Sequence, residues 1–393
     1  MTTSSYADTN DDSLLIFFQN PSGGLNNPVR YAAGASAYSV AIADFNGDGR
    51  NDVAVGKRTD GIRVFIQDLG GGFTNFTDYA TSYAHWICSA DFDNDGRADL
   101  AGIGWSDSKV ALFTQTTNGT LSFVTNYDAS YSGRNDIEAG DVDNDGLMDI
   151  VVMSGQTYAD PNVSVLLQTS NGFAPAVVYD LGGRVVTRGV RIGDVNGDDR
   201  NDIVVSYDGA LASKIAVFQL TSSGVITNTY DTYDLPQPIV VADMDLDGRA
   251  DIVTLHSGGQ ALGVYWQNAA GSLEQEQLFQ PLPYASIYNP HGLAVGDINS
   301  DGMPDVVIAD YNNGLIVLTN ALPAPPLMVS RIQRKPDSSV VLTAPFRGTN
   351  GSCVVEASES LTNWTPIGVM SDRTWKDTNA PAASKRFYRL VAQ

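Results

Sequence analysis

Short runs of apolar residues alternate with polar turns along the first 320 residues of this chain. Residues 40–43 and 53–55 are two such runs, on either side of an acidic segment. Runs of this length, bounded by Gly, Asn and Asp, are typical of β-strands and leave little room for helices. The pattern therefore predicts an all-β fold.

The acidic segment itself is repeated. It occupies residues 44–52 and recurs at 91–99, 141–149, 194–202, 243–251 and 297–305. Successive copies begin 47, 50, 53, 49 and 54 residues apart. A repeat near 50 residues is typical of propellers and of repeat arrays.

Each repeat also contains two later strand-like runs. The third run ends near a glutamine and the fourth near a tyrosine: Gln67, Gln115, Gln168, Gln219 and Gln267, then Tyr79, Tyr127, Tyr179, Tyr233 and Tyr284. Four short strands joined by turn residues are typical of a propeller blade, in which a meandering sheet is repeated around an axis. We expect four-stranded antiparallel blades.

The sequence is compatible with two numbers of blades. The third-strand pattern also occurs at residues 15–19 and 315–318, which gives seven third strands for six acidic segments. We expect a seven-bladed β-propeller, in which the chain begins halfway through a blade. Six blades are the alternative, if the N-terminal strands complete the last blade, and a truncated N-terminus would explain the mismatch equally well.

The repeat pattern ends at a proline-rich stretch. We therefore divide the chain into a propeller at 1–320, a linker at 321–328 and a C-terminal module at 329–393. Apolar runs at 340–342, 353–357 and 386–391 predict a small β-sandwich for this module. Residues 327–393 carry 9 basic and 5 acidic side chains, whereas the preceding 326 residues carry 14 and 40.

The overall charge and hydropathy narrow the range of partners. A formal net charge of -22 argues against nucleic acid or an anionic membrane as the partner. The longest apolar run, residues 14–18, has the length of a strand, so no membrane span is expected. Residues 1–12 do not resemble a signal peptide, although a cleaved one is compatible with this sequence. Cys88 and Cys353 are far apart, and we expect no disulfide between them.

The acidic segments have the spacing of a calcium loop. Calcium takes six to eight oxygen ligands, and a tight loop can supply them from alternate side chains and one backbone carbonyl. In the second segment, Asp91, Asp93 and Asp95 occupy positions 1, 3 and 5, Arg97 offers its carbonyl at position 7, and Asp99 completes the set at position 9. The other five sets are Asp44, Asn46, Asp48, Arg50 and Asp52; Asp141, Asp143, Asp145, Leu147 and Asp149; Asp194, Asn196, Asp198, Arg200 and Asp202; Asp243, Asp245, Asp247, Arg249 and Asp251; and Asp297, Asn299, Asp301, Met303 and Asp305.

About six structural calcium ions are therefore expected, and they would reduce the net charge from -22 to -10. Three of the segments supply four carboxylates each. The other three supply three carboxylates each, because Asn stands at position 3. Asp199 replaces the usual glycine in the fourth segment, and Asp adopts the left-handed conformation less freely than Gly. We expect that site to be the weakest or the most strained.

These segments resemble the FG-GAP or VCBS repeats, a family of calcium-binding propellers that includes the N-terminal domain of integrin α subunits and several lectins. The resemblance covers about residues 13–320 and implies a secreted or cell-surface protein that acts in adhesion, glycan recognition or, more rarely, polysaccharide cleavage. Residues 361–364 and 387–390 resemble the fibronectin-like C-terminal modules of secreted bacterial proteins. The fold alone does not choose among these functions.

The face opposite the acidic loops is the predicted ligand face. Six residues before each acidic segment, at the expected channel mouth, the side chain is polar: Tyr38, His85, Asn135, Arg188, Gln237 and His291. Other connections on this face add Trp105, Tyr207, His256 and Tyr311. Aromatic and hydrogen-bonding side chains together suit a carbohydrate or carboxylate ligand, although strands that begin near solvent often start with a polar residue.

The sequence thus favours an extracellular carbohydrate-binding or adhesion protein without catalytic activity. The alternative is a polysaccharide lyase or glycoside hydrolase at the channel mouth, with His85, His291 or Tyr38 as base and Arg188 neutralising a uronate. A hydrolase would draw its two carboxylates from Asp136, Asp208 and Asp310. A third interpretation is a rigid scaffold for cell-surface protein partners.

Overall fold

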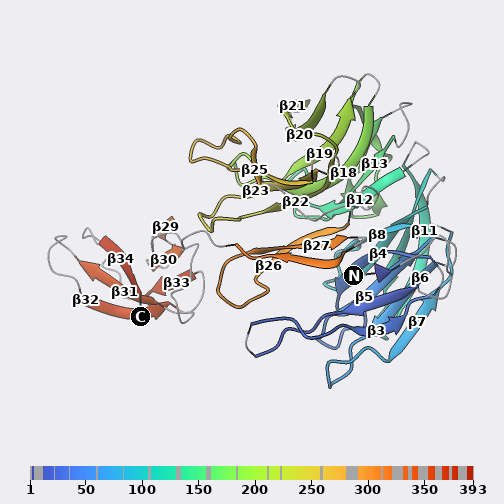
Figure 1. Cartoon of the computed structure of the whole chain (residues 1–393), viewed down its shortest axis with the longest axis horizontal. Coiled ribbons are helices and arrows are strands. Elements are labelled where there is room, and N and C mark those ends of the chain that lie inside the picture. The colour runs from blue at the N-terminus through green and yellow to red at the C-terminus, as the bar shows by residue number, and fades with distance from the viewer. Residues whose placement is uncertain are drawn as a thin grey trace.

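The computed structural model consists of β-strands arranged around an axis, followed by a separate group of C-terminal strands (Figure 1). It describes residues 2–3, 12–21, 23–34, 36–58, 61–82, 84–104, 108–129, 134–155, 161–182, 185–209, 212–221, 224–256, 260–279, 291–310, 313–320, 331–334, 339–343, 353–358, 365–370, 374–378 and 387–392. No helix occurs within these ranges. The all-β prediction is confirmed.

Five sheets have four antiparallel strands in sequential order, as a blade requires. The first three are β4 (Ala37–Ala43), β5 (Asp52–Lys57), β6 (Gly61–Ile66) and β7 (Asn75–Tyr79); β8 (Trp86–Ala90), β9 (Asp99–Ile103), β10 (Lys109–Gln115) and β11 (Leu121–Asp128); and β12 (Arg134–Gly140), β13 (Asp149–Ser154), β14 (Asn162–Leu166) and β17 (Val177–Asp180). The next two are β18 (Val185–Gly193), β19 (Asp202–Gly209), β20 (Ser213–Thr221) and β21 (Gly224–Asp231); and β22 (Pro236–Ala242), β23 (Asp251–His256), β24 (Ala261–Tyr265) and β25 (Gln277–Phe279). A short pair, β15 (Gln168–Thr169) and β16 (Gly172–Phe173), extends the hairpin of the third blade.

The sixth blade has three described strands, β26 (Leu293–Gly296), β27 (Asp305–Asp310) and β28 (Gly314–Leu318). Six blades are found, the smaller of the two numbers that the sequence left open. A further three-stranded sheet, β1 (Thr2–Thr3), β2 (Ser13–Ile16) and β3 (Val29–Ala32), contains no acidic loop. This N-terminal sheet contacts the sixth blade through Gln19, whose Nε2 donates to Ile298 O at 2.7 Å, and the first blade through β1 and β4.

Burial differs systematically across a blade. The second and third strands are buried on both faces, as in β13 and β14, because each blade packs between two neighbours. The core therefore forms between blades: Ile103 and Leu112 of the second blade pack with Ile137 and Val152 of the third. Outermost strands such as β7 are largely exposed. The first strands contact one another in succession around the axis, so they line the centre of the propeller.

The C-terminal strands form two three-stranded sheets. One contains β29 (Arg331–Arg334), β30 (Val340–Thr343) and β33 (Thr374–Asp377), and the other contains β32 (Thr365–Met370), β31 (Cys353–Ser358) and β34 (Phe387–Ala392). The predicted linker, 321–328, lies outside the described residues. A search of the described part of the chain found no helix with the length and apolar character needed to cross a membrane.

Candidate functional site

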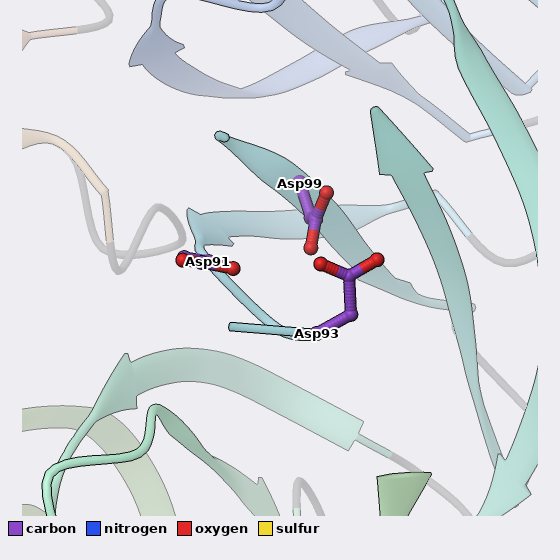
Figure 2. A group of neighbouring side chains, drawn as sticks. All are labelled: Asp91, Asp93 and Asp99. Carbon is purple, nitrogen blue, oxygen red and sulfur yellow. The ribbon is translucent and has the colours of Figure 1, made fainter. Parts of the chain in front are cut away.

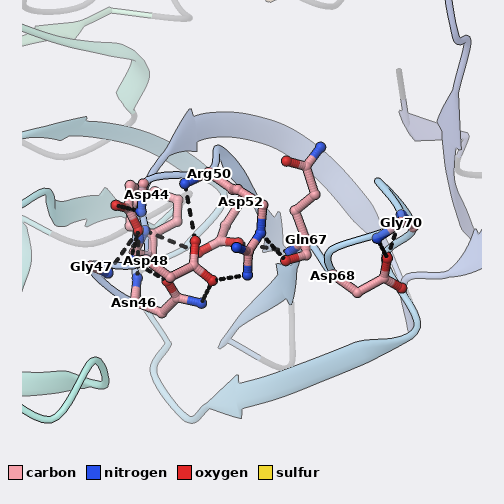
Figure 3. A network of polar contacts seen from close by, with 12 residues as sticks. Asp44, Asn46, Gly47, Asp48, Arg50, Asp52, Gln67, Asp68 and Gly70 are labelled. Carbon is pink, nitrogen blue, oxygen red and sulfur yellow. Dashed lines mark hydrogen bonds and ion pairs between the residues drawn. The ribbon is translucent and has the colours of Figure 1, made fainter.

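Each acidic loop joins the first and second strands of a blade and is anchored by the aspartate at position 9. These six aspartates are 0–1% exposed: Asp52, Asp99, Asp149, Asp202, Asp251 and Asp305. In the first blade, Asp52 Oδ2 accepts from Phe45 N at 3.1 Å and Oδ1 accepts from Gln67 N at 2.8 Å (Figure 3). The second bond ties the acidic loop to the hairpin between the third and fourth strands. Both connections therefore lie on one face of the blade.

The aspartate at position 1 organises the backbone of its loop. Asp44 accepts from Gly47 N and Gly49 N at 2.7 Å each, and Asp91 accepts from Gly96 N at 2.7 Å. Asp199 takes the place of this glycine in the fourth loop, adopts φ 63° and still donates its N–H to Asp194 at 2.9 Å. The loop geometry is thus kept, in a backbone region that costs a non-glycine residue free energy.

The loops with four carboxylates bring three of them together. Oxygens of positions 1, 3 and 9 lie within 4.8 Å of one another in the second, third and fifth loops. Figure 2 shows Asp91, Asp93 and Asp99 converging on one point. An all-oxygen donor set of this kind fits a hard cation such as calcium.

The carboxylate at position 5 has other partners. Asp95 Oδ1 accepts from Arg97 N at 2.9 Å, and its second oxygen pairs with the Arg97 guanidinium. Asp48 with Arg50 and Asp247 with Arg249 repeat this arrangement. Sequence reasoning assigned only the carbonyl of position 7 a role and overlooked the side chain of the arginine.

Crowding of carboxylates changes their protonation. Burial, together with neighbouring carboxylates, raises the pKa of Asp99, Asp202 and Asp251 to about 7 each and that of Asp149 to about 6. Burial and adjacent carboxylates also raise the pKa of Asp93. Asp44, at position 1 of the first loop, behaves differently: burial acts to raise its pKa, but four backbone N–H donors outweigh burial and lower the value. A bound cation would favour the ionised form at every position.

On the opposite face, the structure brings two predicted ligand residues together. The rings of Tyr38 and His85 meet edge to face with centroids 4.0 Å apart, and His85 stacks on Trp86 at 4.1 Å. His85 is 2% exposed, and burial followed by the charge of Arg58 lowers its pKa to about 3. A base with this pKa is neutral at physiological pH but a weak proton acceptor.

Arg188 and His291 both face carboxylates. Arg188 Nε donates to Asp208 Oδ2 at 2.6 Å, while Ser213 Oγ donates to Asp208 Oδ1 at 2.7 Å. His291 Nε2 lies 2.7 Å from Oδ1 of Asp136, a residue with no exposed surface. Burial acts to raise the pKa of Asp136, but His291 and Arg191 lower it below the usual range.

The remaining predicted residues are dispersed. Gln237 and Tyr207 are buried at 4% and 9% exposure. His256 is fully buried, with Nε2 2.7 Å from Glu276 Oε1 and Nδ1 3.0 Å from Asp234 O. Trp105, Tyr311 and the side chain of Asn135 lie outside the described residues.

Sequence reasoning missed two charged residues near Asp136. Arg191 Nη1 donates to Asp136 Oδ2 at 2.9 Å and lies 3.5 Å from Glu138 Oε2. Both residues lie on first strands, each three positions beyond the predicted channel-mouth residue of its blade, and the available signal was a charged side chain flanked by apolar residues within the strand.

The acidic segments match a known repeat family. Residues 44–102, 91–152 and 243–308 match the model of the FG-GAP-like repeat family. The chain contains FG-GAP-like repeats. No curated protein matches the chain. The solved structure of a protein from Lactobacillus plantarum aligns with a TM-score of 0.44 at 10% identity, over 84% of this chain and 96% of that one. The repeat match and the observed blades are consistent with a binding or adhesion role.

Proposed function

We propose that this protein is an extracellular binding protein whose propeller is stabilised by calcium and whose ligand is a carbohydrate. The observation that carries the metal assignment is the recurrence of one loop in six blades, with converging carboxylates in the second, third and fifth. Repetition in one register is not expected of acidic turns that serve only solubility. The calcium ions would be structural, because each loop surrounds its site with its own oxygens.

The ligand assignment depends on the face of the propeller opposite the acidic loops. Arg188 and His291 place cationic or hydrogen-bonding groups there, each oriented by a carboxylate. Tyr38, at the predicted channel mouth of the first blade, adds an aromatic ring that packs on the buried His85. Saccharides are commonly recognised by polar groups next to aromatic rings. An acidic saccharide would in addition gain from the arginine.

One experiment tests this assignment. The calcium-loaded protein is mixed with a panel of neutral and acidic polysaccharides, and size-exclusion chromatography records both co-elution and polymer length. Co-elution with intact polymer is the expected result. Shortening of the polymer would replace the binding assignment with that of a lyase or hydrolase. If no polysaccharide in the panel co-elutes or is shortened, a scaffold for protein partners becomes the better hypothesis.

A further inference from the structure

A cavity of about 450 Å³ lies between the fourth and fifth blades, on the face that carries the acidic loops. Its fourth-blade wall belongs to the loop between β18 and β19 and consists of Asp194, Asn196, Gly197 and Asp199. Its fifth-blade wall consists of residues 248–250 of the next acidic loop and residues 267 and 269–271 of the β24–β25 hairpin. Volumes of about 300–1,000 Å³ are typical of small-molecule sites. The cavity is therefore large enough for an organic ligand.

The cavity faces the outer side of the fourth acidic loop and lies apart from its predicted calcium site. Asp198 and Asp202, two of the five predicted calcium ligands of this loop, do not line the cavity. The Asn196 side chain points into the loop, where Nδ2 donates to Asp202 Oδ1 at 3.0 Å. The Asp194 carboxylate is also held within the loop, by backbone donors such as Gly197 N at 2.6 Å. A ligand in the cavity would therefore be separate from the calcium ion.

Gln267 presents a buried hydrogen-bond acceptor to this cavity. The residue is 3% exposed, and its Nε2 donates to Asp194 O at 3.3 Å, which fixes the orientation of the amide because a backbone carbonyl only accepts. Oε1 has no hydrogen-bond partner in the described part of the chain, and it lies 3.6 Å from the position of a Cβ built on Gly197, on the opposite wall. In the third blade, Gln168 Oε1 instead accepts from Met148 N at 2.8 Å. A buried acceptor without a donor costs free energy that a ligand N–H would recover.

Asp199 supplies a second acceptor to the cavity. It occupies position 6 of its loop, where the other five loops have glycine. Four of those glycines have no neighbouring atom within 4 Å of a Cβ built on them: Gly49, Gly96, Gly146 and Gly302. A side chain at this position therefore leaves the loop, and in the fourth blade Asp199 lines the cavity. Within the described residues Asp199 bonds through its backbone N–H, to Asp194, so its carboxylate is available to a ligand.

The charges around the cavity favour a cationic ligand. Arg249 is the cationic residue of the lining, but its guanidinium pairs with Asp247 and its Nε donates to Gln267 O at 2.9 Å. Its charge is therefore already balanced. The two adjoining acidic loops, 194–202 and 243–251, contain eight aspartates and two arginines. They remain net negative even with one calcium ion in each.

The rest of the lining distinguishes an organic cation from a metal ion. Calcium takes six to eight oxygen ligands, whereas the available side-chain acceptors of the lining are Gln267 Oε1 and the Asp199 carboxylate. The remaining walls are small and apolar, formed by glycines and by Ala250, Ala269 and Ala270. Walls of this kind suit methylene groups. An ammonium group carries three donors and no acceptor, so it matches the acceptors that the cavity offers.

We propose that the cavity between the fourth and fifth blades binds a primary ammonium group on a short aliphatic chain. The ammonium donates to Gln267 Oε1 and to the Asp199 carboxylate, and the methylenes lie against the alanines. A lysine side chain of a partner protein and a free alkylamine both present this chemistry, and both are protonated at pH 7. The site lies on the face opposite the proposed saccharide ligand, so the two sites can be tested separately.

Isothermal titration calorimetry measures binding to the full-length protein in calcium buffer at pH 7. The probes are n-butylamine and Nα-acetyl-lysine methylamide, and the controls are 1-butanol and Nα-acetyl-norleucine methylamide, which lack the ammonium. We expect saturable binding of the ammonium probes and none of the controls. Tighter binding of the lysine probe would identify a protein partner as the source, and tighter binding of n-butylamine would identify a free amine. Absence of saturable binding by either ammonium probe, or equal binding by the controls, would overturn the inference.

Two variants with the same substitution separate this site from general attraction to an acidic protein. Asp199→Asn removes the charge at the cavity, and Asn tolerates the left-handed φ of 63° at this position. Asp180→Asn removes an exposed charge from the third blade and keeps an acceptor for Gly182 N. Asp199→Asn should weaken binding of the ammonium probes about tenfold, because a charge-assisted hydrogen bond is lost, whereas Asp180→Asn should leave it unchanged. Equal affinities in the two variants would overturn the inference.

A variant that fills the cavity provides an independent test. Ala269 is exposed and lines the cavity, so Ala269→Leu should occupy the space without disturbing the fold. We expect this variant to lose ammonium binding and to keep the melting temperature of the parent protein. Unchanged affinity would place the ammonium outside the cavity and would contradict the proposal.

Discussion

Asp136 and His291 are joined near the axis of the propeller, with Oδ1 of the aspartate 2.7 Å from Nε2 of the histidine. Asp136 belongs to β12 of the third blade, whereas His291 directly precedes the sixth. Asp136 also accepts from Val190 N at 3.1 Å in the fourth blade. One buried carboxylate therefore connects three blades.

This connection predicts an order of stability among variants. Asp136→Ala removes the closer of the two carboxylates beside Arg191, together with the partner of His291 and the acceptor of Val190 N, and should cost about 3–5 kcal/mol of unfolding free energy. His291→Ala leaves Asp136 with Arg191 and a backbone donor, so the loss should be smaller, about 1–3 kcal/mol. Urea unfolding of both variants measures the difference. Similar, small losses in both would contradict a role for Asp136 in joining the blades.

Calcium should contribute to the stability of the propeller. Binding to the folded state alone adds about 2.7 kcal/mol for each site when free calcium is 100-fold above the dissociation constant. Chelator should therefore lower the melting temperature substantially, and added calcium should restore it. Differential scanning calorimetry provides the measurement, with magnesium as the control for a hard cation of smaller radius. An unchanged transition in chelator would defeat the metal assignment.

The pH dependence in chelator should have an unusual sign. The pKa values of Asp99, Asp202 and Asp251 are raised to about 7, so between about pH 4 and 7 the folded state binds more protons than the unfolded state. Unfolding free energy should therefore fall as pH rises through this window. Thermal melts in chelator at pH 5 and pH 8 test this, and a higher melting temperature at pH 8 would contradict it. Calcium should oppose the trend, because it binds the ionised carboxylates.

Two aspartates of one loop should differ in their contribution to folding. Asp99 accepts from Phe92 N and Gln115 N at 2.8 Å each, so Asp99→Ala leaves two buried donors unsatisfied, at about 1–3 kcal/mol each. Asp93 is exposed, and Asp93→Ala should cost little when calcium is absent. Urea unfolding in chelator compares the two, and equal losses would show that position 9 has no separate structural role. In calcium, both variants should lose stability.

The repeat made the fold and the acidic loops predictable from sequence, because one spacing recurs in six blades. Which side chains meet one another near the axis was less predictable from the sequence. Tyr38, His85, Arg188 and His291 all lie six residues before an acidic loop, yet Arg188 pairs with Asp208 and His291 pairs with Asp136. Pairing of this kind depends on how blades face each other, which the repeat of a single strand does not encode.

The predicted ligand face can be tested at Arg188. Its guanidinium pairs with Asp208, which is buried but keeps Ser213 as a donor, so Arg188→Ala should cost about 1–3 kcal/mol of stability. If an acidic polysaccharide binds here, the variant should lose at least tenfold in affinity, because a charge-assisted hydrogen bond to a carboxylate is removed. Lys214 also pairs with an aspartate, Asp231, at the exposed side of the fourth blade, so Lys214→Ala is the matched control for a general loss of positive charge. Isothermal titration calorimetry compares the two variants, and equal affinity in both would place the ligand elsewhere on the protein.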